Sequence, residues 1–152
     1  MALPNIFTKS VADQVVQRIN QLSPDTKGKW GKMSVSQMLA HCNVTYEMIY
    51  TDMHPKPNAF VKIIMKLFIK SKVVSETPYK PDGPTAPQFI IKETKDFDAE
   101  KKRLVAYIMK TQELGEDSFE GKESHAFGVL NKAEWNNMLY KHINHHLNQF
   151  GV

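Results

Sequence analysis

Two histidines near the end of the sequence, His142 and His146, stand four residues apart in a segment with helical periodicity. Successive residues of an α-helix turn by ~100°, so both imidazoles project from one face of the helix, together with Trp135. Such a pair can grip a divalent metal, and neutral imidazole suits zinc, nickel, copper or iron(II). The same spacing also fits two hydrogen-bonded histidines near the end of a helix bundle. The spacing by itself leaves both interpretations open.

A third metal ligand would come from another helix, and His41 is the candidate. It lies on the shoulder of the apolar face of a predicted helix, outside the polar sector that holds Asn43 and Glu47. In that position the imidazole can point into a groove between helices. We expect Glu47, in the polar sector, to face solvent. His145 projects roughly 60–120° away from the histidine pair, so we expect it at the edge of the bundle, as a surface histidine or a proton shuttle. No HExxH motif is present, so a zincin-type protease is not supported.

Four segments carry the apolar periodicity of amphipathic helices and would position these side chains. They cover residues 9–22, 34–53, 97–111 and 131–150. Two of them begin with a capping box, at Ser34 and at Asn131, in which side chains satisfy free backbone amides. We expect Trp30 and Trp135 to belong to the core. Four such helices in a short chain predict an all-α, up-down four-helix bundle.

An extra helix and a proline-rich loop are inserted between the second and third predicted helices. Residues 59–71 are apolar except for lysines on one narrow face, and residues 78–87 contain four prolines. The wide apolar sector of the helix fits a lid over the mouth of the bundle or a homodimer interface. An anionic membrane surface is the alternative partner for an apolar helix with a lysine face.

The composition is that of one compact soluble domain over residues 1–152, with 41% apolar and 24% charged residues. A net charge of +4 and only two arginines argue against nucleic-acid binding. The single cysteine, Cys42, excludes an internal disulfide and a zinc ribbon. The sequence shows no signal peptide and no apolar run of ~18 residues, so we expect a cytoplasmic protein without a membrane span.

Two stretches of the chain resemble the DinB-like superfamily, and within it a branch of small, uncharacterised bacterial proteins. Residues 30–42 are similar to its second-helix signature, and residues 135–151 are similar to its final helix. Residues 124–130 are similar to the loop before that helix, with Ala126 where the branch often carries proline. The resemblance implies a bundle of DinB-like type with a mononuclear metal site. Carried over to this sequence, its three ligands are His41, His142 and His146, with His125 and His145 as second-shell or spare ligands.

The function that follows is a metal-dependent enzyme with an open coordination position. A bound thiol or water would be acidified by the cation, which suits transfer of a low-molecular-weight thiol or hydrolysis of a small substrate. The characterised members of the superfamily are similar to the first case. Zinc and nickel are the metals we expect first. The alternative is a non-catalytic helical binding or scaffold protein with a vestigial metal site.

Overall fold

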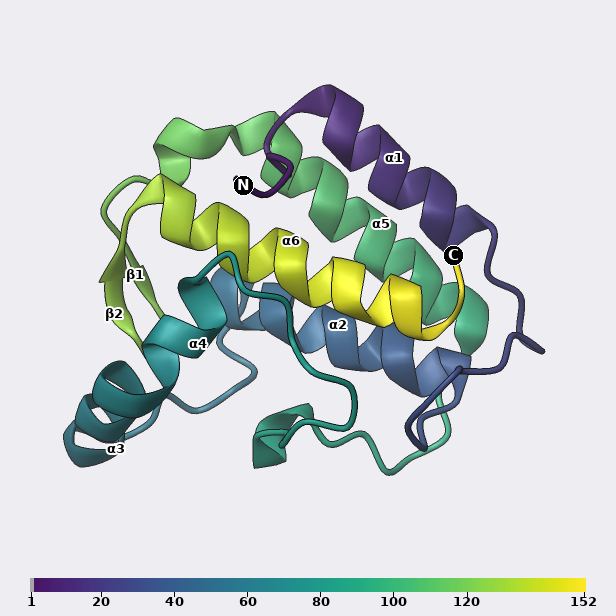
Figure 1. The fold of residues 1–152 in the computed structure, drawn as a ribbon, viewed down its shortest axis with the longest axis horizontal. Coiled ribbons are helices and arrows are strands. Elements are labelled where there is room, and N and C mark those ends of the chain that lie inside the picture. Colours follow the sequence, from purple (N-terminus) through teal and green to yellow (C-terminus); the bar gives the residue numbers. More distant parts are fainter. Residues whose placement is uncertain (1) are drawn as a thin grey trace.

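The computed structural model describes residues 2–152 and is dominated by four long helices around one core (Figure 1). These are α1 (Lys9–Asn20), α2 (Val35–Tyr50), α5 (Phe97–Leu114) and α6 (Lys132–Gln149). Each helix contacts two of the others, α1 and α2 lying on opposite sides of the pair formed by α5 and α6. The expected all-α bundle is confirmed. The largest fully buried side chains of the core are those of Trp135, Tyr46, Phe119, Ile6, Ile19, Met38, Leu39, Leu104, Ile108, Leu130, Leu139 and Ile143.

The helices run up, down, down and up along the chain. Asn43 of α2 bonds to Glu100 of α5, and Tyr50 further along α2 bonds to Thr111 further along α5, so these two neighbours are parallel. Simple alternation is therefore broken once, between α2 and α5. The physical reason is the long insert that joins them, because it gives the chain enough length to return to the starting end of the bundle.

The helix starts follow the predicted capping chemistry. The Ser34 hydroxyl accepts from the amide of Gln37 at 3.2 Å, and the Gln37 side chain accepts from the amide of Ser34 at 3.0 Å. Asn131 forms the second capping box at the start of α6. The ends were less well predicted, since α2 stops at Tyr50 and α5 continues to Leu114. The four predicted helices are therefore confirmed, with C-termini that differ from the predicted ones by a few residues.

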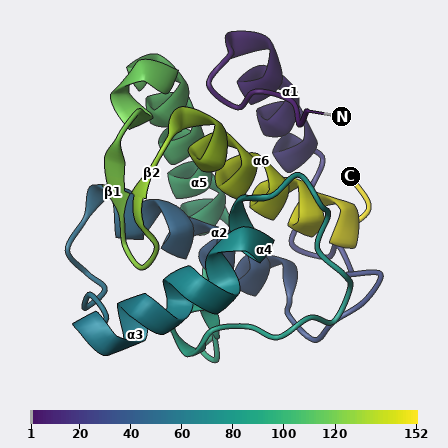
Figure 2. The same ribbon diagram turned by 60° about the vertical axis from the view of Figure 1, so that its left-hand side comes forward.

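The insert forms a broken helix and then a long loop. The helix consists of α3 (Ala59–Ile64), a π-helical turn (Met65–Ile69) and α4 (Lys70–Val74). α4 docks against α6, whereas α3 stands at the edge of the molecule beyond the four long helices (Figure 2). The predicted lid over the bundle mouth is therefore wrong for α3. In the loop, a 3₁₀ turn at Pro87–Phe89 contacts α2.

A short hairpin precedes α6, in a segment that we had expected to be a loop. Strands β1 (Lys122–Ser124) and β2 (Gly128–Leu130) are antiparallel, with Glu123 opposite Val129. A 3₁₀ turn (Glu116–Phe119) joins α5 to this hairpin. The strands have three residues each, too few for a pattern of alternating burial to be recognised in a sequence.

α2 is the central helix of the molecule and has almost no solvent face. Its residues from Met38 to Glu47 are buried or nearly so. The expectation that Glu47 faces solvent is wrong, because the residue is 6% exposed and its carboxylate pairs with Arg103 of α5 and with His54. The polar sector of α2 faces α5 rather than water, so its polar side chains are paired inside the protein.

Among the described residues, none of the helices is both long enough and apolar enough to cross a lipid bilayer.

Candidate metal centre

Three imidazoles meet where α2 and α6 cross the core. His41 comes from α2, and His142 and His146 come from successive turns of α6. One ring nitrogen from each lies within 4.8 Å of the others. The Nε2 atoms of His41 and His142 are 3.0 Å apart. The structure thus brings together the three residues that the sequence singled out, and we call them the histidine triad.

The outer nitrogen of each triad ring contacts an oxygen atom. His41 Nδ1 lies 2.8 Å from the carbonyl oxygen of Phe89, and His142 Nδ1 lies 3.0 Å from the Thr45 hydroxyl. His146 Nδ1 lies 2.8 Å from Oε1 of Gln149. Each Nδ1 can donate its proton to one of these oxygens, which leaves each Nε2 with a free lone pair.

Gln149 is itself held in one orientation. Its amide nitrogen donates to the carbonyl oxygen of Trp30 at 2.8 Å, so its amide oxygen faces His146. Gln149 is 4% exposed, and this burial protects both hydrogen bonds from water. Metal-binding histidines in proteins usually donate their second ring N–H to such a fixed oxygen, which sets the tautomer and the ring orientation.

The Nε2 atoms of His41 and His142 are close enough that a proton or a cation must lie between them. If His41 and His142 both donate through Nδ1, their bare Nε2 atoms face each other at 3.0 Å and repel unless a cation or proton lies between them. The Thr45 hydroxyl can accept or donate, so a single proton on His142 Nε2 is the arrangement without metal. If that proton moved to Nδ1 and were donated to the Thr45 hydroxyl, the Nε2 lone pair of His142 would become available to a divalent metal without the release of a proton.

The triad is neutral at physiological pH. Burial lowers the pKa of His41, and burial together with the neighbouring imidazoles lowers the pKa of His142 well below its ordinary value. Burial, and then the nearby His41, lower the pKa of His146 to about 3. Neutral imidazole is the form that binds a metal, so no deprotonation has to accompany binding at pH 7.

The Phe89 ring covers the triad from the side of the inserted loop. Its centroid lies 5.3 Å from that of His41 and 5.9 Å from that of His142. His41 and His146 are only 6% and 7% exposed. The loop therefore contributes both a hydrogen-bond acceptor and an apolar cover, although it lies far from either helix in the sequence.

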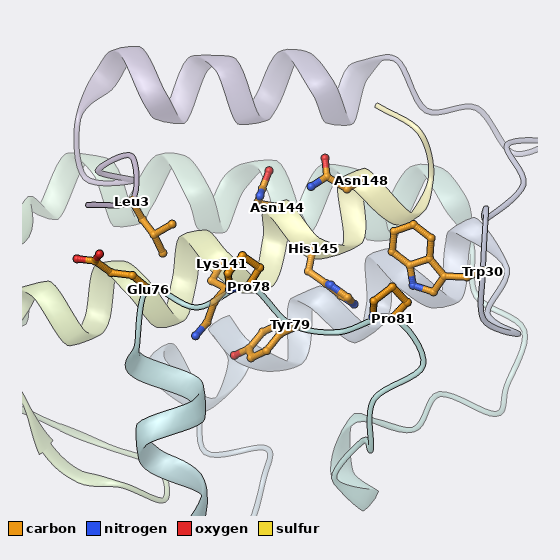
Figure 3. Close-up of a pocket in the computed structure, with 10 residues that line it drawn as sticks. All are labelled: Leu3, Trp30, Glu76, Pro78, Tyr79, Pro81, Lys141, Asn144, His145 and Asn148. Carbon is orange, nitrogen blue, oxygen red and sulfur yellow. The ribbon is translucent and has the colours of Figure 1, made fainter. Parts of the chain in front are cut away.

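His145 lies outside the triad, at the floor of a surface pocket of about 150 Å³ (Figure 3). Its ring is 5.0 Å from that of His146, 5.8 Å from Trp30 and 5.7 Å from Tyr79, measured between centroids. The pocket is lined by Leu3, Trp30, Glu76, Pro78, Tyr79, Pro81, Lys141, Asn144, His145 and Asn148. Trp30 is thus a half-buried pocket wall and not the core residue that we had expected, whereas Trp135 is buried as predicted.

His125 lies on the hairpin, where its Nε2 is 3.2 Å from the carbonyl oxygen of Pro55. It borders a different pocket, of about 330 Å³, and is not among the clustered ligands. Cys42 is buried beside Met38, and burial raises the pKa of its thiol, which keeps it protonated. Neither residue contributes to the triad.

Comparison with known families matches residues 7–151 to a family model described as a protein of unknown function (DUF1569). The chain belongs to this family. No curated protein and no solved structure matches it. The match covers α1 to α6, so the triad, its outer partners and the inserted loop all lie within the family's extent in this DUF1569 chain.

Sequence reasoning missed the outer partners of the triad. Thr45 follows His41 by one helical turn, and Gln149 follows His146 by three residues, so both could have been found by asking which polar neighbours share the ligand face. The Phe89 carbonyl could not, because a backbone acceptor 48 residues away leaves no trace in residue type.

Proposed function

We propose that this DUF1569 protein binds one divalent metal ion through Nε2 of His41, His142 and His146. The observation that carries the proposal is the arrangement of the three rings, with every Nδ1 on an oxygen atom, the Nε2 atoms of His41 and His142 facing each other, and one nitrogen of each ring within 4.8 Å of the others. Metal–imidazole bonds of ~2.0–2.1 Å need ligand nitrogens a few ångströms apart. The three ligand nitrogens lie within 4.8 Å of one another, so the rings would draw closer together by rotation to bind one ion.

The donor set consists of three neutral nitrogens. Such a set suits zinc and nickel, and also copper or iron(II). It does not suit calcium or magnesium, because these ions prefer oxygen ligands. The hydrogen-bond partners of the triad rings, among the described residues, are a backbone carbonyl, a hydroxyl, an amide and one another. Because none of these is a carboxylate, the charge of a bound dication is not neutralised by the protein, which favours an anionic fourth ligand.

We further propose that this fourth ligand is the thiolate of a low-molecular-weight thiol, which the protein transfers to a small electrophile. A bound dication lowers the pKa of a coordinated thiol and so supplies a nucleophile at neutral pH. The resemblance of residues 30–42 and 135–151 to the DinB-like superfamily supports the same chemistry. Hydrolysis by a metal-bound hydroxide is the alternative chemistry, since a bound dication would also lower the pKa of a coordinated water.

The protein's own residues have three roles in this scheme. The triad rings hold the cation, and Thr45, Gln149 and the Phe89 carbonyl hold the rings. The Phe89 ring limits the entry of water from the loop side. Substrate would approach from the pocket beside His145, whose aromatic walls suit the apolar body of a small electrophile and whose imidazole can carry a proton between solvent and the site.

The test is metal content by elemental mass spectrometry on untagged protein, with His142→Ala as the variant and His125→Ala as the matched control. We expect about one metal per chain in the wild type and in His125→Ala, and a sharp loss in His142→Ala. Equal metal content in all three proteins, or none after loading with zinc or nickel, would overturn the metal site.

The second part of the test uses the metal-loaded wild type. Transfer of a thiol such as cysteine or glutathione to a panel of electrophiles should exceed the rate of the His142→Ala protein. Metal-loaded protein that reacts no faster than this variant would refute thiol transfer and leave metal binding intact.

The burial of the triad under Phe89 favours one other candidate, a non-catalytic protein that holds or senses a metal. In that case metal binding would change the melting temperature without conferring turnover. The two measurements above separate the candidates, because the first detects the metal and the second detects transfer.

A further inference from the structure

The broken helix from α3 to α4 carries the largest group of exposed apolar side chains in the described part of the chain. Seven large side chains there are between 36% and 71% exposed. They are those of Phe60, Val61, Ile63, Ile64, Leu67, Phe68 and Ile69. Soluble monomers rarely expose so many contiguous apolar residues, and such patches usually mark a binding surface. We call this group the α3 face.

The spacing of the α3 face is that of a helix that packs on another helix. Phe60, Ile63, Ile64, Leu67 and Phe68 follow one another at i, i+3, i+4, i+7 and i+8. In a regular α-helix this pattern makes one apolar stripe, which in a globular protein normally faces the core. In the structure Phe60, Ile63 and Ile64 belong to α3, whereas Leu67 and Phe68 continue the apolar surface in the π-helical turn. Here the stripe faces solvent, because the π-helical turn separates α3 from α4, and only α4 docks on the bundle.

Two lysines of the polar stripe of the same helix are turned toward the protein. Lys62 lies 3.5 Å from the carboxylate of Glu123 on the hairpin, and Lys70 lies 2.8 Å from that of Glu134 on α6. These ion pairs fix which side of the helix faces inward, although each exposed pair adds little to stability. They also neutralise two of the three lysines that would otherwise attract an anionic membrane.

We propose that a second copy of this chain covers the α3 face, with α3 of one copy packed against α3 of the other about a two-fold axis. An isologous contact needs only one self-complementary surface. The apolar stripes of α1, α2, α5 and α6 are already buried in the core. The α3 face is therefore the free apolar helix surface that one copy can offer to another.

The exposed area agrees with what a dimer needs. An aromatic side chain buries about 150–250 Å² when fully covered, and an aliphatic one somewhat less. With exposed fractions of 36% to 71%, the seven side chains together present on the order of 600 Å² per copy. Adding the surrounding polar rim brings the buried area close to the ~800 Å² per partner of a standard stable interface. An anionic bilayer is disfavoured by comparison, because the paired lysines leave Lys66 as the one lysine of the stripe without an ion pair in the described structure.

The experiment is the molar mass of the full chain in solution, measured by light scattering after size exclusion and by sedimentation over a concentration series. The wild type is expected at twice the 17.4 kDa of one chain. The double variant Phe60→Gln/Leu67→Gln is expected to be a folded monomer, with a dimer dissociation constant raised by at least ~100-fold. Both side chains are exposed in one copy, so their removal does not disturb the core.

Leu114→Gln is the matched control, since Leu114 is 44% exposed at the end of α5 and outside the α3 face. It should remain dimeric. Geometry is checked by crosslinking, because Cys42 is buried and an introduced thiol would be the reactive one. Oxidation with diamide should join copies of Ile64→Cys but not copies of Leu114→Cys.

A monomeric wild type, or a dimer that persists in the double variant, would overturn the proposal. Vesicles containing phosphatidylglycerol provide the remaining arm. A monomeric wild type that co-sediments with them, while the double variant does not, would assign the α3 face to lipid instead of a second copy. Metal content plays no part in these measurements, so their failure is independent of the proposed metal site.

Discussion

Thr45→Val is the most informative single substitution, because it changes one hydrogen bond of the triad and nothing else in its first contacts. The Thr45 hydroxyl lies 3.0 Å from His142 Nδ1 and is 8% exposed. Valine keeps the branched shape but cannot accept the ring proton. With metal bound, His142 must donate through Nδ1, so the variant leaves that donor without a partner.

Loss of such an outer partner typically weakens metal binding 10- to 100-fold. This corresponds to about 1.4–2.7 kcal/mol of binding free energy. Leaving a buried polar group unsatisfied costs a similar amount of folding stability, about 1–3 kcal/mol. The two effects must be measured separately, the first by competition for zinc with a chromophoric chelator and the second by urea unfolding of the metal-free protein.

Thr111→Val provides the matched control. Thr111 is also a buried threonine, fully shielded from solvent, and its hydroxyl contacts Tyr50 and the carbonyl oxygen of Tyr107 instead of a triad ring. It should lose stability to a similar degree and keep wild-type zinc affinity. If the two variants bind zinc equally well, within about twofold, the outer hydrogen bond does not support a metal and the argument from ring orientation fails.

Three further predictions concern the cover, the charge state and the buried ion pairs. Phe89→Ala should release metal to EDTA several-fold faster than the wild type, because the ring no longer covers the triad; an unchanged rate would show that access lies elsewhere. In metal-free protein the free energy of unfolding should fall as the pH drops from 6.5 to 5. The folded pKa of His146 lies at about 3, below its unfolded value, so only the unfolded state takes up a proton in this range. Uptake of one proton by the unfolded state lowers the free energy of unfolding by up to ~1.4 kcal/mol per pH unit. His146→Gln should reduce that slope by about this amount, and an unchanged slope would contradict a neutral buried ring. Arg103→Met should destabilise the protein by about 2 kcal/mol, because it removes the one guanidinium shared by the buried carboxylates of Glu47 and Glu100. The loss is smaller than for a fully buried pair, since Arg103 is 40% exposed and the two carboxylates keep His54 and Asn43 as partners; a loss below ~0.5 kcal/mol in urea unfolding would contradict this.

The local chemistry of the chain was readable from its sequence. Both capping boxes formed as predicted, because a cap depends on residues three positions apart. The placing of His142 and His146 on one helix face followed from the helical repeat in the same way. The apolar sector of residues 59–71 was recognised too, since exposure does not alter a periodic pattern.

What the sequence could not give was the identity of each neighbour. Periodicity states which side of a helix is apolar, but α2 is surrounded on nearly all sides, so Glu47 met Arg103 instead of water. The position of residues 59–71 could not be predicted either, because a π-helical turn divides the helix and only α4 docks on α6. The width of its apolar sector favoured a lid or a dimer interface over a membrane surface, but it could not separate the lid from the dimer.

The same distinction between local pattern and tertiary packing applies to the histidine triad. The sequence by itself determined which imidazoles share a face. Only the tertiary structure decided the register of α2 on α6, which sets His41 against His142 at 3.0 Å and Thr45 behind it. The Phe89 carbonyl joined them through the loop. The reason is that helical periodicity acts over a few residues, whereas packing joins positions 48 to 101 residues apart, and no local pattern encodes those distances.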